Sequence, residues 1–214
     1  MKITDAAVYP YPYGDTSVRR MALEARALGF DSLVAIDTPS GHCEGMEIYS
    51  GVSIRNSPMR DVIARVKRAK DAGAVVSVCA RDNGFNRAVI GLKGVHILRG
   101  IQAAGRDAFD HVTAKMAAEN NVAVDIDLSP LISGRGVLRQ RAIHGYRDLL
   151  SFRNRYRFPI TFSTGSRSCL QLRGVREITG LTSLIGMDVD DVAAALGGVG
   201  MVTTPPPPAV REIP

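Results

Sequence analysis

The chain has 214 residues, of which 45% are hydrophobic and 22% are charged, and its formal net charge at pH 7 is +6. These values fit a globular domain with a substantial core and exclude a disordered or fibrous chain. No apolar run approaches the roughly 20 residues of a membrane-spanning helix, and the N-terminus lacks the apolar segment of a secretory signal. Cys43, Cys79 and Cys169 are too scattered for a disulfide framework or a zinc site. We therefore expect a cytoplasmic protein with no membrane partner.

Short β-rich runs alternate with amphipathic patterns in the first half of the chain. The expected strands are residues 3–9, 32–36, 46–54, 74–80 and 94–98. The expected helices are residues 17–28, 57–71 and 86–92. Ser57 is the expected N-cap of the second helix, with Pro58 in its first turn and Gly73 at its end.

The second half repeats this alternation. The expected helices are residues 110–120, 138–153, 175–185 and 188–196, and the expected strands are residues 122–128 and 159–163. Repeated β-then-α units indicate a mostly parallel sheet with helices outside it, and their number favours a compact barrel. The dinucleotide motif GxGxxG and the P-loop motif GxxxxGK[ST] are both absent from the sequence.

The chain changes character after residue 196. Residues 197–200 read GGVG, and four prolines follow at positions 205–208. Such a sequence is typical of an extended chain without regular structure. We expect one barrel domain over residues 1–196 and a disordered tail over residues 197–214.

Residues 135–176, which we call the arginine-rich segment, hold nearly all the positive charge of the chain. The segment contains ten arginines, no lysine and one acid, Asp148, for a net charge of +9. The rest of the chain has a net charge of −3. A local excess of this kind predicts a polyanionic partner, and the planar guanidinium group binds phosphate in a bidentate manner.

Two parts of the arginine-rich segment are candidates for binding phosphate. Arg153, Arg155 and Arg157 alternate with other residues, and an extended conformation would align them along one exposed edge. The alternative is a helix end at which arginines complement the helix dipole. The hydroxyl-rich run 163–166, with Arg167 after it, follows an expected strand and fits either a phosphate cradle or an ordinary polar turn.

Three other residues are candidates for a metal site or for acid–base chemistry. Asp125 and Asp127 project from the same face of one expected strand, and His96 lies on another short strand. The alternative is that the carboxylates neutralise neighbouring arginines. The remaining histidines show no HxH or HExxH spacing.

Residues 153–188 resemble a known family most specifically. Residues 156–168 read YRFPITFSTGSRS and residues 184–188 read LIGMD, with Leu172-Arg173 and Arg176-Glu177-Ile178 between them. This pattern resembles archaeal ribonuclease P protein component 3. Residues 85–87 and 109–119, which read FNR and FDHVTAKMAAE, are also similar to that family. The resemblance covers most of residues 1–190.

The resemblance implies an α/β, TIM-barrel-like (β/α) fold related to the polymerase-and-histidinol-phosphatase barrels. It also implies a non-catalytic RNA-binding subunit of ribonuclease P, the endoribonuclease that removes the 5′ leader from precursor tRNA. Catalysis is then expected from the RNA subunit with its Mg²⁺, and this chain is expected to bind no cofactor or metal. The implied partners are ribonuclease P RNA, an RRM-like small protein subunit, the other ribonuclease P proteins and, indirectly, precursor tRNA.

On this basis we expect a set of arginines to contact RNA: Arg87, Arg99, Arg139, Arg153, Arg155, Arg157, Arg167, Arg173 and Arg176. The candidates for a phosphate-binding loop are Ser163, Thr164, Gly165 and Ser166.

The chain also departs from the barrels that it resembles. Related hydrolytic barrels begin with Asp-x-His-x-His, whereas residues 5–9 here read DAAVY, and both histidines are absent. This difference agrees with a binding function. Two alternatives remain, namely a metal-dependent phosphoesterase that uses Asp125, Asp127 and His96, and a barrel whose arginines dock acidic protein partners.

Overall fold

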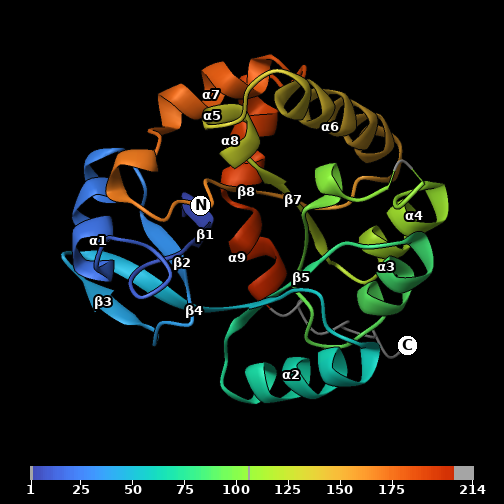
Figure 1. Ribbon diagram of the computed structural model, residues 1–214, viewed down its shortest axis with the longest axis horizontal. Helices are drawn as coiled ribbons and strands as arrows, with labels where there is room; N and C mark the ends of the chain where they lie inside the picture. Colours follow the sequence, from blue (N-terminus) through green and yellow to red (C-terminus); the bar gives the residue numbers. More distant parts are fainter. Residues whose placement is uncertain (1, 106, 205–214) are drawn as a thin grey trace, which may run out of the picture.

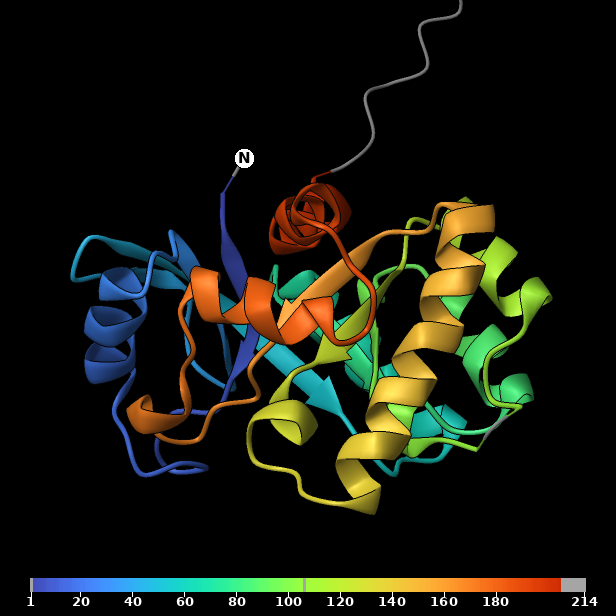
Figure 2. The same cartoon turned by 90° about the horizontal axis from the view of Figure 1, so that it is seen from above.

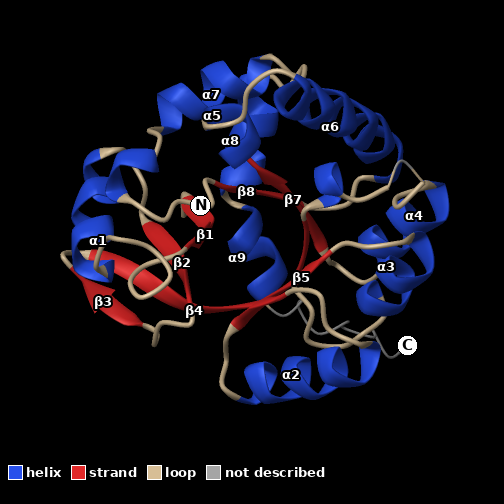
Figure 3. Cartoon of the chain, viewed as in Figure 1, coloured by secondary structure: helices blue, strands red, loops and turns tan. Residues whose placement is uncertain are grey.

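The protein folds as a barrel of parallel strands surrounded by helices (Figures 1 and 3). The computed structural model describes residues 2–105 and 107–204. Over these residues the barrel strands follow one another in chain order and pair in parallel. They are β1 (Thr4–Val8), β2 (Ser32–Ile36), β4 (Met46–Ile54), β5 (Val75–Cys79), β6 (Ile97–Arg99), β7 (Ala123–Asp127) and β8 (Ile160–Ser163). The expected TIM-barrel-like α/β fold is confirmed.

The loop after β8 closes the barrel against the first strand. Gly165 donates its backbone N–H to the carbonyl of Ala7, and Tyr9 donates its own to the carbonyl of Ser166. Outside the barrel path, β3 (Gly41–Cys43) pairs antiparallel with β4. This hairpin turns through Glu44 and Gly45, and both residues have positive φ. The sequence patterns did not predict β3.

Helices cover the outside of the barrel in the described residues. They are α1 (Val18–Ala27), α2 (Met59–Asp71), α3 (Asn83–Ile90), α4 (His111–Glu119), α5 (Ser129–Ile132), α6 (Val137–Tyr156), α7 (Val175–Ser183) and α8 (Val189–Leu196), with short 3-10 turns η1 (Ile101–Ala103) and η2 (Cys169–Gln171). Ser17, Asp82, Asp110 and Asp188 each accept a backbone N–H at a helix start. None of these helices is long and apolar enough to cross a lipid bilayer.

Two sequence-based boundaries differ from the structure at helix starts. The N-cap of α2 is Pro58, and the hydroxyl of Ser57 donates to the carbonyl of Arg55 instead of capping the helix. Helix α3 begins at Asn83, three residues earlier than expected, because Asp82 accepts the N–H of Phe85. Within the described residues Cys43, Cys79 and Cys169 are free thiols, as expected.

The expected disordered tail does not begin at Gly197, because residues 198–203 form the helix α9 (Gly198–Thr203). Val199 and Val202 of this helix are buried in one cluster with residues of the barrel interior, such as Val34 and Ile97. A side chain at position 198 would collide with the carbonyl of Ile160, so glycine permits this close approach. Burial of these two valines thus stabilises α9 although its sequence is rich in glycine. The prolines at 205–208 lie outside the described residues.

Helix α9 lies at the N-terminal end of the barrel, where the strands begin. Figure 2 shows the C-terminal end of α6 on the same side of the barrel as α9, and the N-terminal end of α6 on the opposite side, toward which the strands point. Helix α6 has 20 residues and is therefore about 30 Å long. Helix α6 therefore extends from one end of the barrel to the other.

Candidate nucleic-acid interface

A buried ion pair joins β6 to β7 inside the barrel. Arg99 is 2% exposed, and its Nε lies 3.0 Å from Oδ2 of Asp125. The other guanidinium nitrogens donate to the hydroxyl oxygens of Ser163 and Tyr9, while Asp125 also accepts from Thr161 and Ser163. Burial opposes the charge of Arg99, but the neighbouring Asp125 raises the pKa of the guanidinium, so Arg99 stays charged.

This network decides between the two interpretations of Asp125. The carboxylate neutralises an internal arginine and accepts hydrogen bonds from neighbouring hydroxyls, so its oxygens are occupied within the barrel. Burial also corrects the expectation for Arg99, because a side chain enclosed in the barrel does not reach a bound RNA.

The expected phosphate cradle directs its hydroxyls into the protein. Thr164 donates its hydroxyl to Oδ2 of Asp5 at 2.6 Å, and the hydroxyl of Ser166 bonds to that of Thr164. Ser163, Thr164 and Ser166 are all buried, and Gly165 supplies the positive φ that turns the chain back toward β1. Burial raises the pKa of Asp5 to about 7. The loop is therefore a closure of the barrel, and it presents no exposed hydroxyl to an anion.

His96 and Asp127 do not join Asp125 in a metal site. Nδ1 of His96 accepts the backbone N–H of Val76, just before β6 begins, and burial lowers the pKa of this imidazole. Asp127 lies at the C-terminal end of β7 and accepts the N–H of Ser129. The histidine and this carboxylate thus occupy opposite ends of their strands. Residues 2–105 and 107–204 contain no cluster of three potential His, Cys, Asp or Glu ligands.

Tyr9, at the C-terminal end of β1, is surrounded by three arginines. The guanidinium carbons of Arg55 and Arg167 lie 5.6 Å and 4.9 Å from the centre of its ring. Its hydroxyl oxygen accepts hydrogen bonds from Arg55 and from the buried Arg99. The cation–π contacts hold Arg55 and Arg167 over the end of the barrel while both remain exposed.

A further arginine lies beside this group. The guanidinium of Arg81, after β5, is 4.7 Å from the centre of the Phe85 ring, and it donates to the carbonyl of Ser57 in the loop after β4. We call Tyr9, Arg55, Arg81 and Arg167 the mouth cluster. Among the described residues, none of its arginines has a carboxylate within 4.0 Å. Their charge therefore remains available for an anionic partner.

The arginine-rich segment does not form one surface, because α6 separates its members. Arg139 lies near the start of the helix and donates to the carbonyl of Leu131. Arg153 lies in its last turn and forms an ion pair with Asp191. Arg155 is exposed over the Tyr156 ring, and Arg157 follows the helix with a φ of 58°. The prediction that these arginines form an extended row along one edge is wrong, because they lie at the end of a helix. Two residues that are two positions apart in a helix differ by about 200° around its axis, so their side chains point to nearly opposite sides.

The remaining expected RNA contacts are distributed over other elements. Arg87 on α3 pairs with Asp110, whose pKa is lowered because hydrogen bonds to the carboxylate outweigh its burial. Arg173 donates to the carbonyls of Leu170 and Leu172 beside η2, and Arg176 is exposed in the first turn of α7.

Asn86, in the sequence stretch that resembles the known family, has a structural function. Its side chain is buried and donates to the carbonyls of Arg81 and Ala108, while its oxygen accepts the N–H of Arg81. These bonds tie the loop after β5, which carries Arg81, to the segment before α4.

Comparison with known proteins agrees with this architecture. The model of the family "RNase P subunit p30" matches residues 2–202. Ribonuclease P protein component 3 of Methanococcoides burtonii is 30% identical over 199 residues, which cover 90% of this chain and 83% of the relative. Ribonuclease P protein component 3 of Halorubrum lacusprofundi is 30% identical over 215 residues, with coverages of 92% and 89%.

A solved structure has the same fold. A chain in the cryo-EM structure of archaeal ribonuclease P with mature tRNA is similar with a TM-score of 0.77 and 17% sequence identity, and the match covers 94% of this chain and 89% of that one.

Fold and site together define a TIM-barrel-like protein whose interior carboxylates are held by its own arginine and hydroxyl groups, and which carries three exposed arginines on loops where the strands end. The chain belongs to the RNase P subunit p30 family, that is, to the protein components of ribonuclease P. This membership confirms the resemblance in the sequence and gives no support to the phosphoesterase alternative.

Proposed function

We propose that this chain is a non-catalytic, RNA-binding subunit of ribonuclease P that supports removal of the 5′ leader from precursor tRNA. The RNA subunit, with Mg²⁺ bound to it, would carry out the cleavage. The other partners would be an RRM-like small protein subunit and the remaining ribonuclease P proteins, in the cytoplasm. Family membership and the similarity to a chain of an archaeal ribonuclease P structure support this proposal.

The mouth cluster is the observation that carries the RNA-binding function. Three exposed guanidinium groups lie on loops after three different strands, at the end of the barrel where proteins of this fold bind ligands. Each retains N–H groups that could donate to phosphate oxygens, because its hydrogen bonds within the described residues go to one carbonyl or one hydroxyl. Contacts of this kind bind a phosphate backbone without reading its sequence.

Other arginines extend this surface in the proposal. Arg139 at the start of α6 and Arg173 beside η2 follow β7 or β8 in the chain, and we assign them to the same RNA-binding surface. Arg176 would make a separate contact, because α7 begins beside the carbonyl of Leu28, between α1 and the start of β2. Arg155 and Arg157 lie at the other end of α6 and would form a second, separate contact.

Reconstitution of precursor-tRNA cleavage tests the function. The cognate ribonuclease P RNA and the other protein subunits are assayed at low Mg²⁺ with and without this chain. We expect the chain to accelerate cleavage, because cationic side chains and Mg²⁺ both offset the repulsion between RNA phosphates. An equal rate without the chain would contradict the proposal.

A further inference from the structure

The segment between β1 and α1 presents two aromatic rings to solvent. Residues 9–13 read YPYPY, and Tyr9 of the mouth cluster is the first of these three tyrosines. Tyr11 and Tyr13 are 75% and 51% exposed, whereas every other aromatic side chain in the described part of the chain is buried or half-buried. Covering an aromatic ring is favourable, so two neighbouring exposed rings indicate a surface that a partner covers.

Hydrogen bonds fix the conformation of this segment. Tyr11 donates its backbone N–H to the carbonyl of Thr16. Asp15 donates its own to the carbonyl of Arg167, and the guanidinium of Arg167 donates to the carbonyl of Tyr13, both at 2.8 Å. Because the backbone is already ordered, the two rings lose little conformational entropy when a partner binds.

Gly14 allows the segment to lie against the loop after β8, which carries Arg167. A Cβ at position 14 would be 2.0 Å from the carbonyl oxygen of Arg167, so any other residue would push the two loops apart. Figure 2 shows the segment between β1 and α1 on the side of the barrel toward which the strands point. The exposed rings therefore lie at the same end of the barrel as the mouth cluster.

Cationic and aromatic groups thus meet on this pair of loops. The guanidinium of Arg167 lies 4.9 Å from the centre of the Tyr9 ring and bonds to the carbonyl of Tyr13. The carboxylate of Asp37 lies beside the hydroxyl of Tyr13 and raises its pKa, so this side chain stays neutral. Because a carboxylate repels phosphate and a guanidinium attracts it, a nucleotide on the Tyr13 ring would direct its phosphate toward Arg167.

This combination of groups favours an unpaired nucleotide. A base inside a duplex is covered on both faces by its neighbours, whereas an unpaired base has free faces that stack on aromatic rings. The arginines of the mouth cluster, which have no carboxylate within 4.0 Å among the described residues, match its phosphates in charge. An apolar protein segment would cover the rings but leave these cations without a counter-charge.

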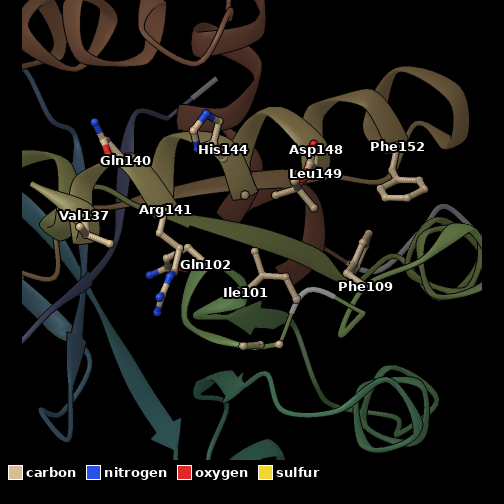
Figure 4. A pocket seen from close by; sticks show the side chains of 13 residues that line it. Ile101, Gln102, Phe109, Val137, Gln140, Arg141, His144, Asp148, Leu149 and Phe152 are labelled. Atoms are coloured by element: carbon tan, nitrogen blue, oxygen red, sulfur yellow. The ribbon is translucent and has the colours of Figure 1, made fainter.

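The aromatic rings in the cavity beside α6 are engaged with each other (Figure 4). This cavity has a volume of about 660 Å³, and Phe109 and Phe152 are part of its lining. Their rings pack edge to face with centroids 6.1 Å apart, and Phe109 also packs against Phe158 at 5.5 Å. Tyr11 and Tyr13 are accordingly better placed than these phenylalanines to stack on a base.

We propose that Tyr11 and Tyr13 stack on unpaired bases of ribonuclease P RNA, while the mouth cluster contacts the phosphates of the same strand. The proposal deepens the proposed function and rests on it, because it takes ribonuclease P RNA as the partner. Every base has a π face, so this contact selects single-stranded over double-stranded RNA without reading its sequence.

Two matched pairs of substitutions test the stacking. Tyr11→Leu/Tyr13→Leu keeps apolar side chains but removes both rings, whereas Tyr11→Phe/Tyr13→Phe keeps the rings and removes only the hydroxyls. Filter binding to ribonuclease P RNA should show a loss of affinity of about 10-fold or more for the leucine pair, and of about 2-fold or less for the phenylalanine pair. The slope of log affinity against log salt should be the same as in the wild type, because stacking releases no counterions.

A fluorescent variant measures the stacking directly, also if the leucine pair does not fold. The sequence contains no tryptophan, so Tyr11→Trp introduces a single indole that stacks on bases as a tyrosine ring does. Its emission should be quenched by ribonuclease P RNA and by single-stranded oligouridine, and little by a blunt RNA duplex. Quenching by a leader oligonucleotide of precursor tRNA but not by ribonuclease P RNA would overturn the assignment to ribonuclease P RNA.

Three further results would overturn the proposal. They are unchanged RNA affinity of a folded leucine pair, an equal loss of affinity in both pairs, and weaker binding of another ribonuclease P protein with RNA affinity intact. The last result would assign the rings to a protein partner. Each of them leaves the proposed function standing as long as the wild-type chain accelerates precursor-tRNA cleavage, and failure of that acceleration contradicts the proposed function separately.

Discussion

The two ends of the barrel differ in what their cations contact. At the C-terminal end, Arg55, Arg81 and Arg167 lie over aromatic rings and donate to a hydroxyl or to carbonyls. At the N-terminal end, Arg153 pairs with Asp191 and Lys2 pairs with Glu47. Arg155 and Arg157 at that end have no carboxylate within 4.0 Å among the described residues. The aromatic contacts of the mouth cluster hold the guanidinium groups in place without cancelling their charge, whereas the two ion pairs neutralise the charges of Arg153 and Lys2.

This difference shows that the density of arginines in the sequence is a poor guide to charge on the surface. The arginine-rich segment has a net charge of +9, yet α6 divides it between both ends of the barrel. Two of the three arginines in the mouth cluster, Arg55 and Arg81, come from outside that segment. The comparison predicts that substitutions inside the barrel affect stability and that substitutions in the mouth cluster affect binding.

The largest expected effect concerns the arginine inside the barrel. Arg99→Gln leaves the buried Asp125 without its cation, and we expect the free energy of unfolding to fall by about 3–5 kcal/mol. Urea denaturation measures this change. The double variant Arg99→Gln/Asp125→Asn should recover part of the loss, because neither charge is then unpaired. If Arg99→Gln has the same free energy of unfolding as the wild type, the buried Asp125 does not need Arg99 as its counter-charge.

The second prediction concerns Asp5, whose pKa is raised from 3.8 to about 7 by burial. At pH values between these two pKa values, Asp5 is protonated in the folded state and ionised in the unfolded state. The contribution of Asp5 to stability therefore decreases as the pH rises. It is lost fully once the pH exceeds the folded-state pKa. From about pH 5 to about pH 8 we expect a decrease of about 2–3 kcal/mol.

Asp5→Asn should remove that part of the pH dependence. The free energy of unfolding of both proteins is measured in urea at the two pH values, and the difference between the proteins isolates Asp5 from the other titrating groups. Identical pH profiles would mean that the carboxyl is ionised in the folded state.

The third prediction concerns the surface of the mouth cluster. Arg55→Gln, Arg81→Gln and Arg167→Gln together should weaken binding to ribonuclease P RNA by about 30–100-fold at low salt, and reduce the slope of log affinity against log salt by about 2 to 3. Filter binding over a salt series measures both. Urea denaturation should show nearly unchanged stability, because all three side chains are exposed. An unaltered salt slope would show that RNA contacts other residues than these three arginines.

The sequence predicted the barrel well because its strands are short apolar runs separated by helix caps and glycines. The limits of β2 and β4 agree with the expected residues 32–36 and 46–54. Helix α9 was missed because its glycines disfavour a helix, and only burial of Val199 and Val202 against the barrel interior stabilises it. Local patterns do not contain that tertiary contact.

The site was less accessible to sequence reasoning because its residues are far apart in the chain. Tyr9, Arg55 and Arg81 each occur one or two positions after a strand. Since parallel strands end at the same edge of a barrel, that placement was a usable signal, although the local density of arginines drew attention to α6 instead. The burial of Arg99 depends on its partner Asp125, 26 positions away, and no local pattern reveals that pairing.

The smallest expected effect concerns the far end of α6. Arg155 and Arg157 are exposed there, without a carboxylate within 4.0 Å among the described residues, beside the ion pair of Arg153 with Asp191. Arg155→Gln/Arg157→Gln should weaken RNA binding by about 3-fold or less, and change the salt slope by less than about 1. Glutamine retains the polar side chain, so stability should stay within about 0.5 kcal/mol of the wild type.

The same filter-binding series as for the mouth cluster measures this effect, so that the loss per arginine can be compared directly. A loss per arginine equal to that in the mouth cluster would show that RNA contacts both ends of the barrel. In that case Asp191→Asn should raise RNA affinity as well, because it would release the charge of Arg153 at the same end. An Asp191→Asn variant with unchanged affinity, together with a weak effect of the double variant, would confine the RNA contact to the end where the strands terminate.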